Sequence, residues 1–180
     1  MTGHNEGRVT ADAAPEHNLS QDQDTAVALL AACLLAPARS VADVLDDCTV
    51  DDVELLDQPT AIALTVCHEL ANIRTKPAAD VVSAELLRRG LYAGHSGNLV
   101  RSRILTAATI TVWPELLAQY AAAVLARVFR ARIAAFGAAL AEGAFVAGES
   151  DLWELLVREG TRARRIRSQL DHIRAETSMA

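Results

Sequence analysis

Apolar residues recur at helical spacing along most of this chain, and no run alternates in the way that a half-buried β-strand requires. Val27, Leu30 and Leu34 share one face of a predicted helix that Pro37 ends. A similar stripe within 59–73 predicts a second helix, which the Lys76-Pro77 pair ends. Shorter helices are expected at 40–48, 78–90 and 98–108, with Gly90 as a stop and a loop over 91–98, and one or two turns are expected at 50–56.

The start of the chain lacks this pattern. Residues 1–20 are polar and aperiodic, so they are expected to form a disordered tail. Ser20, Asp22 and Asp24 are cap candidates for the first helix. Ser40 and Asp43 have the spacing of a capping box for the second.

The longest periodic segment runs from Val112 to Ala144, with Pro114 in its first turn. Large apolar residues line one side of this helix and small ones line the other, so a wide arc is apolar. The stripe predicted as an oligomer interface is Leu117, Tyr120, Val124, Val128, Ala131, Ala135 and Ala138. A second stripe is Leu125, Phe129, Ile133, Phe136, Leu140 and Ala144. A single buried stripe is usual in a monomeric bundle, so this arc indicates a partner helix.

A break at 146–150 precedes a last helix, so the two long helices are expected to form a hairpin. The fold class predicted is all-α: a compact helical bundle over 21–112, followed by a long α-helical hairpin and C-terminal arm over 113–175. Composition agrees, because the chain is 51% hydrophobic but only 4% aromatic and is rich in alanine.

Charge is divided along the chain, whose net value is −6. Residues 1–57 hold twelve acids and two arginines, whereas residues 58–180 hold eleven acids and fifteen bases. The acidic half argues against a nucleic-acid coat, and the basic half leaves room for a local patch. An arginine-rich segment, with Arg158, Arg162, Arg164, Arg165 and Arg167, is consistent with a solvated arm, a docking surface for an acidic protein or a phosphate-backbone contact.

Cysteine usage and hydropathy point to the cytoplasm. Cys33, Cys48 and Cys67 are odd in number and form no CxxC pair, so reduced thiols are expected rather than disulfides or a zinc site. Nothing at the start resembles a signal peptide, and no apolar run reaches the ~20 residues that span a membrane.

No motif predicts catalysis, a cofactor or a metal. A phosphate-binding P-loop needs Gly-Lys-Ser/Thr, but Lys76, the only lysine, lies between Thr75 and Pro77. The segment 68–72, HELAN, begins like a zinc-protease helix but has Asn72 where the second His ligand should be. The acidic run 46–57 is expected to be a solvated face with charges at helix N-termini, and a divalent-ion site is the alternative. No enzymatic activity is therefore expected.

The order of these elements resembles the N-terminal domain of DnaB-type replicative helicases. Three blocks carry the likeness: 24–46, 81–92 and 109–133. In the last block Tyr120, Val124 and an arginine tract (Arg127, Arg130 and Arg132) stand where the family has a tyrosine, a valine and basic residues. The likeness spans about 22–175. It departs from the family at Pro77 and Asp80, which two residues separate, at Trp113-Pro114, and in lacking the ATPase domain.

The resemblance implies a fold and a role. In that family the hairpin packs on the hairpin of another subunit, and the resulting collar contacts primase. The chain is thus expected to be a non-enzymatic, self-associating interaction module of the replication machinery, or primosome, that binds a replicative helicase and/or primase. The alternative is a DNA-binding accessory protein that uses the arginine-rich helix, and a small enzyme with an unrecognised site is a third reading.

Overall fold

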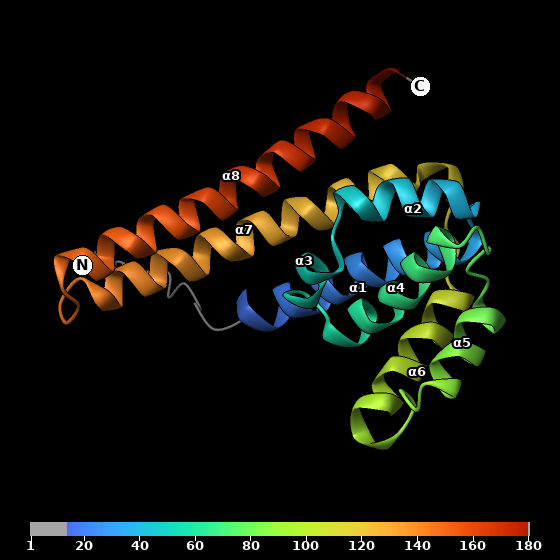
Figure 1. Cartoon of the computed structure of the whole chain (residues 1–180). Helices are drawn as coiled ribbons and strands as arrows, with labels where there is room; N and C mark the ends of the chain where they lie inside the picture. Colours follow the sequence, from blue (N-terminus) through green and yellow to red (C-terminus); the bar gives the residue numbers. More distant parts are fainter. Residues whose placement is uncertain (1–13, 180) are drawn as a thin grey trace, which may run out of the picture.

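The computed structural model describes residues 14–179, and within them every regular element is helical (Figure 1). The predicted all-α class is confirmed. The elements in chain order are α1 (Ala14–Leu35), α2 (Ala38–Asp47), α3 (Val50–Glu54), α4 (Gln58–Asn72), α5 (Ala79–Arg88), α6 (Gly94–Thr109), the 3₁₀ turn η1 (Pro114–Leu116), α7 (Leu117–Gly143) and α8 (Glu149–Met179).

Helix α1 lies at the centre of the bundle. The residues from Leu29 to Leu34 are all buried, although they point to every side of the helix. A helix that is apolar all round is buried all round. Helices α4, α6 and α7 pack around it. The sequence predicted only a single stripe here, so the central position of α1 was underestimated.

The start of α4 is fixed by a buried polar cluster. Asp57 is its N-cap residue and accepts a hydrogen bond from the backbone N–H of Thr60. The same carboxylate receives the guanidinium of Arg103 from α6, at 2.8 and 3.0 Å. Pro59 occupies the first turn, where its missing N–H costs nothing. One residue thus caps α4 and ties it to α6.

The connections end helices where the sequence predicted. Gly90 follows α5 with a φ of 72°, in the left-handed region that glycine adopts without strain. Gly94 has a φ of 69° at the start of α6. This second glycine lets α6 begin at Gly94, so the loop predicted over 91–98 is shorter than expected.

Helices α7 and α8 form the predicted hairpin, and they lie side by side over most of their length (Figure 1). The first half of α7 belongs to the bundle: Ala121, Leu125 and Val128 are fully buried. The second half leaves the bundle together with the first half of α8 and projects as an arm. The boundary drawn at residue 113 thus falls just before a helix that the bundle and the arm share, since α7 is part of both.

Two predictions about helix starts are wrong. Helix α1 begins at Ala14, so residues 14–20 of the predicted tail are helical and Ser20, Asp22 and Asp24 lie inside the helix; residues 1–13 are outside the described part. Helix α2 begins after Pro37 and has no side-chain cap, so Ser40 and Asp43 form no capping box. Pro37 is the N-cap residue, with φ −63° and ψ 146°, and the helix starts after it without a side-chain cap.

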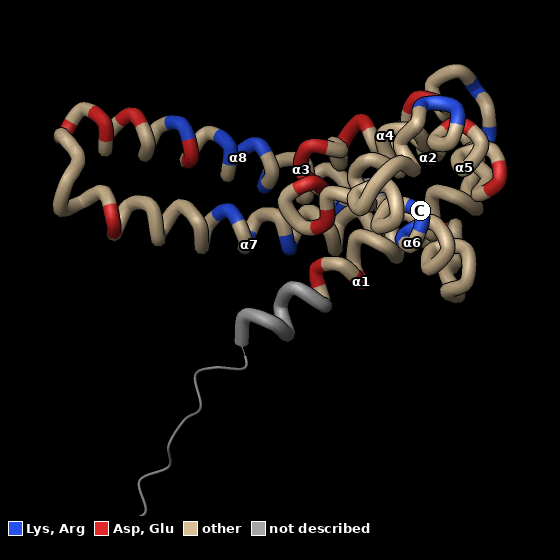
Figure 2. The backbone as a smooth tube through the Cα atoms, turned by 90° about the horizontal axis from the view of Figure 1, so that it is seen from below, with Lys and Arg blue, Asp and Glu red and all other residues tan. Residues whose placement is uncertain are grey.

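Charge is unevenly distributed along α8 (Figure 2). Acids occupy its start near the tip of the hairpin, and arginines predominate closer to the bundle, with Glu159 among them. Among the described helices, none is both long enough and apolar enough to cross a membrane.

Candidate protein-interaction surface

The root of the hairpin is held by apolar packing. Ile166, Leu170 and Ile173, one helical turn apart on α8, are buried at the level of the bundle. Residues at this spacing form one stripe, so the C-terminal half of α8 has a conventional single buried face. This face fixes the direction in which the arm leaves the bundle.

A buried carboxylate reinforces the root. Asp52 on α3 is fully buried and accepts hydrogen bonds from Arg165 on α8, at 3.0 and 3.3 Å, and from the Thr49 hydroxyl, at 2.7 Å. Arg132 on α7 lies 3.8 Å from the same carboxylate. Because a buried charge is tolerated only when paired, these contacts join α3, α7 and α8 at one point. The acidic run was predicted to be solvated, which is wrong for Asp52 and Asp57, but both lie at helix N-termini, as predicted.

The distal half of the arm is exposed on most sides. Phe145 and Val146 at the tip are 91% and 84% exposed. Further along, Trp153 on α8 is 67% exposed and Ile133 on α7 is 44% exposed. Between the two helices Leu152 and Leu155 are half-buried, so the arm keeps an apolar seam of its own. Large exposed apolar residues gathered on one projecting element are typical of an interaction site.

The predicted interface stripe divides at the middle of α7. Leu117, Val124 and Val128 lie inside the core of the same chain and present no surface to a partner. Tyr120 is half-buried against that core. Ala131 is half-buried, whereas Ala135 and Ala138 are exposed on the arm. The part of this stripe that a second molecule can reach is thus its distal end, which consists of small residues.

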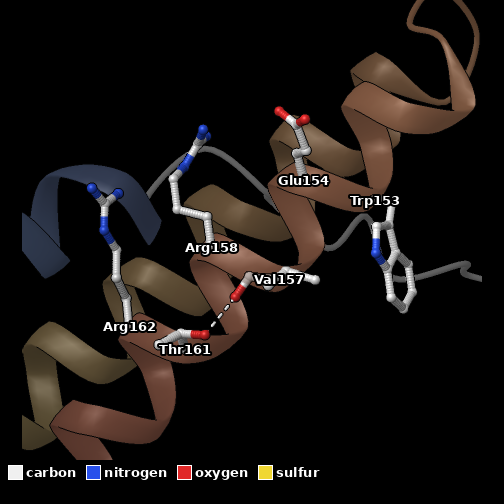
Figure 3. Close-up of a pocket in the computed structure, with 6 residues that line it drawn as sticks. All are labelled: Trp153, Glu154, Val157, Arg158, Thr161 and Arg162. Atoms are coloured by element: carbon white, nitrogen blue, oxygen red, sulfur yellow. Dashed lines mark hydrogen bonds between the residues drawn. The ribbon is translucent and has the colours of Figure 1, made fainter.

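One face of α8 carries two parallel ridges, which we name the α8 ridge face (Figure 3). Trp153, Val157 and Thr161 follow one another at intervals of four residues, and Glu154, Arg158 and Arg162 do the same beside them. They bound a shallow trough that faces outward from the hairpin. The Thr161 hydroxyl donates to the Val157 carbonyl at 2.7 Å, so it adds no exposed donor. The face is apolar along one line and charged along the other.

The five predicted contact arginines are all exposed on α8, but most have an acidic neighbour. Glu159 accepts from both Arg158 and Arg162, at 3.1 and 2.7 Å. Arg165 is committed to Asp52, and Arg167 donates to Asp171 at 2.8 Å. Arg164 projects into solvent one helical turn beyond Gly160 and Thr161.

A second hollow, of about 280 Å³, lies where the arm meets the bundle. Its apolar walls come from Leu55 at the C-terminal end of α3, Phe136 on α7 and Leu155 on α8, with Arg132, Arg158 and Glu159 at its polar side. The Nε atom of Arg132 is buried there without a hydrogen-bond acceptor in the described part of the chain. Sequence reasoning missed this hollow because its walls come from three separate helices.

The three thiols have the character of core residues. All three are buried and unbonded to one another. Burial raises the pKa of Cys48 and of Cys67 to about 12, and raises that of Cys33 well above its usual value. A thiol that stays protonated is a poor nucleophile. His68 pairs with Asp46 at 2.8 Å, and no cluster of His, Cys, Asp and Glu suited to a metal occurs within the described residues.

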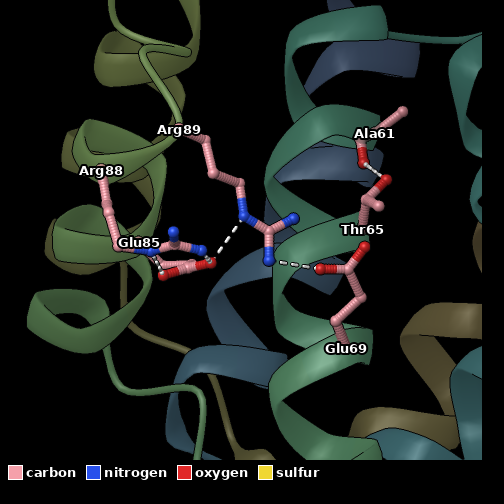
Figure 4. Close-up of polar contacts among 6 residues, drawn as sticks. All are labelled: Ala61, Thr65, Glu69, Glu85, Arg88 and Arg89. Atoms are coloured by element: carbon pink, nitrogen blue, oxygen red, sulfur yellow. Dashed lines mark hydrogen bonds and ion pairs between the residues drawn. The ribbon is translucent and has the colours of Figure 1, made fainter.

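On the far side of the molecule, a charged cluster joins α4 to α5 (Figure 4). Glu85 accepts hydrogen bonds from Arg88, at 2.7 Å, and from Arg89, at 2.6 Å. Arg89 also reaches Glu69 on α4. These hydrogen bonds, that of Arg88 first, lower the pKa of Glu85 to about 2. The cluster stabilises a surface contact and leaves no carboxylate free for proton transfer.

Comparison with known proteins identifies no relative: no family model, curated protein or solved structure matches the chain. The resemblance to the helicase N-terminal domain therefore stays a prediction.

Proposed function

We propose that this protein is a non-enzymatic interaction module, and that the arm formed by α7 and α8 is its working part. The module is cytoplasmic, associates with itself through the distal hairpin, and binds a replicative helicase and/or primase. The observation that carries the proposal is the exposure of large apolar residues on a projecting arm, Trp153 and Phe145 above all. Exposed apolar area of this kind is usually covered by a partner in the cell.

Self-association is supported by the outer face of distal α7. Ala134, Gly137, Ala138 and Ala141 are all exposed there. Small side chains let the backbones of two helices approach closely, which is favourable for a hairpin that packs on its own copy. The larger Ile133 borders this face and adds apolar area to it.

The replication role is supported by the order of three sequence blocks, which resembles that of the N-terminal domain of DnaB-type helicases. The hairpin that this resemblance implies supports it as well. The DNA-binding alternative receives less support. Arg158, Arg162, Arg165 and Arg167 each have a carboxylate neighbour within the chain, which reduces the charge available to phosphates.

The first test is the oligomeric state, measured by light scattering on the purified protein and its Ala138→Glu variant. We expect the native protein to self-associate and the variant to be monomeric, because a carboxylate on the small-residue face would be buried unpaired. Ala108→Glu makes the same change at an exposed position of α6 and serves as the control. A native protein that is monomeric at high concentration would refute self-association.

The second test is co-purification of the tagged protein with the host's replicative helicase and primase, followed by measurement of the mass of any complex. A complex of defined stoichiometry would support the proposed role. If the tagged protein retained DNA but neither the helicase nor the primase, the accessory DNA-binding function would be favoured instead.

A further inference from the structure

The α8 ridge face is separate from the small-residue face of α7, and it combines three properties. Its apolar line is exposed, with Trp153 at 67% and Val157 at 51%. Its arginines are also exposed, with the side chains of Arg158 and Arg162 at 59% and 53%. Tryptophan and arginine are the residues most enriched at the centres of protein interfaces. This face is thus composed like a binding site, yet nothing in the described structure covers it.

The charge on this face is incompletely balanced. A single carboxylate oxygen of Glu159 accepts from the guanidinium groups of both Arg158 and Arg162. Each guanidinium has five N–H donors, so most donors on these two side chains remain for another acceptor. Acidic groups of a partner would complete the pairing with the charge-assisted, bidentate geometry that arginine favours.

The order of charges gives the face a direction. Glu154 lies on the side of the hairpin tip, and Arg158 and Arg162 follow toward the bundle (Figure 3). A partner with its acids at one end and a neutral or basic residue at the other fits in one orientation only. Complementary charge of this kind selects partner and register more than it adds affinity.

The shape of the trough favours a helix as the occupant. All its walls come from one helix, α8, so it encloses no small molecule. Ridges at intervals of four residues form the grooves into which the ridges of another helix pack. Duplex DNA fits less well, because Glu154 and Glu159 stand among the arginines and would repel phosphates.

From these observations we infer that the α8 ridge face docks an amphipathic helix of a partner protein, whose apolar stripe packs on Trp153 and Val157 and whose flanking acids pair with Arg158 and Arg162. The inference rests on the proposed function in that it names the kind of partner that the arm recognises. It assigns that partner to α8 and leaves α7 for self-association.

The experiment uses Trp153 as its own reporter. The chain has two tryptophans, so Trp113→Phe leaves Trp153 as the single tryptophan, whose emission can be excited selectively over that of the tyrosines. The probes are two 18-residue helical peptides with the same leucine stripe, one flanked by glutamates and the other by lysines. We expect the glutamate peptide to shift Trp153 emission to shorter wavelength and to bind at least tenfold more tightly than the lysine peptide.

A charge swap on the α8 ridge face is the decisive test. Arg158→Glu/Arg162→Glu is expected to lose at least tenfold in affinity for the glutamate peptide and to gain affinity for the lysine peptide. The control Arg39→Glu/Arg101→Glu changes net charge equally on the bundle and is expected to bind like the parent. Equal affinity for both peptides, or an unchanged preference after the swap, would overturn the inference.

Other occupants give different results. A Trp153 shift that grows with protein concentration in the absence of peptide would place a second copy on this face and overturn the inference. A shift produced by duplex DNA but by neither peptide would do the same. The monomeric Ala138→Glu variant is expected to bind the glutamate peptide normally. Peptide binding by a protein that does not self-associate would therefore leave this inference standing, even if the self-association proposed above proved wrong.

Discussion

At the scale of single residues, buried charge sets the geometry of the molecule. At the root of the arm, Asp52 accepts hydrogen bonds from Arg165 and Thr49 and lies near Arg132. Inside the bundle, Asp57 accepts hydrogen bonds from Arg103 and Thr60. Both aspartates come from an acidic run whose pattern predicted a solvated face with charges at helix N-termini. Burial depends on which helices arrive from far along the chain, and residue 165 is more than a hundred positions away from residue 52. Local pattern carries no information about such a pairing.

We expect Asp52→Asn to destabilise the protein. The amide keeps the size of the side chain but removes the charge that Arg165 and Arg132 approach, and it leaves their donors with a weaker acceptor. The predicted loss in the free energy of unfolding is about 1–3 kcal/mol, since both arginines are partly solvated. Urea denaturation measures it. The neighbouring exposed Asp51→Asn should change the same quantity by less than about 0.5 kcal/mol, and equal effects of the two substitutions would count against the paired role of Asp52.

The cluster around Glu85 predicts a pH dependence. Its folded pKa of about 2 lies below the ordinary value of 4.5, so the folded state favours the ionised carboxylate. The cluster therefore contributes stability above pH 4.5, and this contribution is lost as the pH falls toward 2. We expect Glu85→Gln to lower the melting temperature at pH 7 by about 2 °C or less, because the contact is exposed to solvent.

The test is the difference in melting temperature between Glu85→Gln and the native protein as a function of pH. The difference should narrow below pH 4.5 and vanish near pH 2. Added salt should also reduce it at pH 7. A difference that widened on acidification would contradict the assignment. Asp80→Asn, on an exposed side chain of the same helix, is the control.

At the scale of elements, periodicity predicted the helices and glycine and proline predicted most of their ends. The position of α4, the stop at Gly90 and the hairpin break follow from residues visible in the sequence. The errors in helix starts arose where polar residues were interpreted as helix caps. A helical start at Ala14 and the absence of a cap on α2 show that polar residues next to a helix need not cap it. Whether an apolar face is core or surface depends on tertiary packing, which is why Leu117, Val124 and Val128 were assigned to an interface.

Replacement of glycine by alanine is expected to have opposite effects on stability at two helical positions. A methyl group at Gly137 on the exposed arm meets nothing within 4 Å, so Gly137→Ala should stabilise α7 by about 0.5–1 kcal/mol. At Gly97 in α6 the same methyl would overlap the backbone of Tyr92. Gly97→Ala should therefore destabilise the bundle by about 1–3 kcal/mol.

Chemical denaturation of the two variants in the monomeric Ala138→Glu background separates these effects from assembly. Gly160→Ala on α8 also meets open space and should resemble Gly137→Ala. A loss of stability in both arm variants would show that distal α7 and α8 are not regular helices in solution.

At the scale of the whole molecule, the chain joins an acidic bundle to an arm whose tip carries the two most exposed large apolar residues of the described chain, Phe145 and Val146. The bundle fixes the arm through buried contacts at its root, and the distal arm has little to pack on within the chain. A stiff arm holds its two faces in a constant relation, with small residues on α7 and the ridge face on α8. One molecule can then contact its own copy and a different partner at the same time.

This architecture predicts the shape of the protein in solution. A compact domain of 180 residues has a radius of gyration of about 16 Å. The 31 residues of α8 alone span roughly 46 Å, so the projecting hairpin should raise the radius measured by small-angle X-ray scattering well above that figure for the monomeric Ala138→Glu variant. In the native protein the radius should rise further with concentration as arms pair. A monomer near 16 Å would mean that the hairpin folds back onto the bundle and covers Trp153, and both faces proposed for binding would then be unavailable.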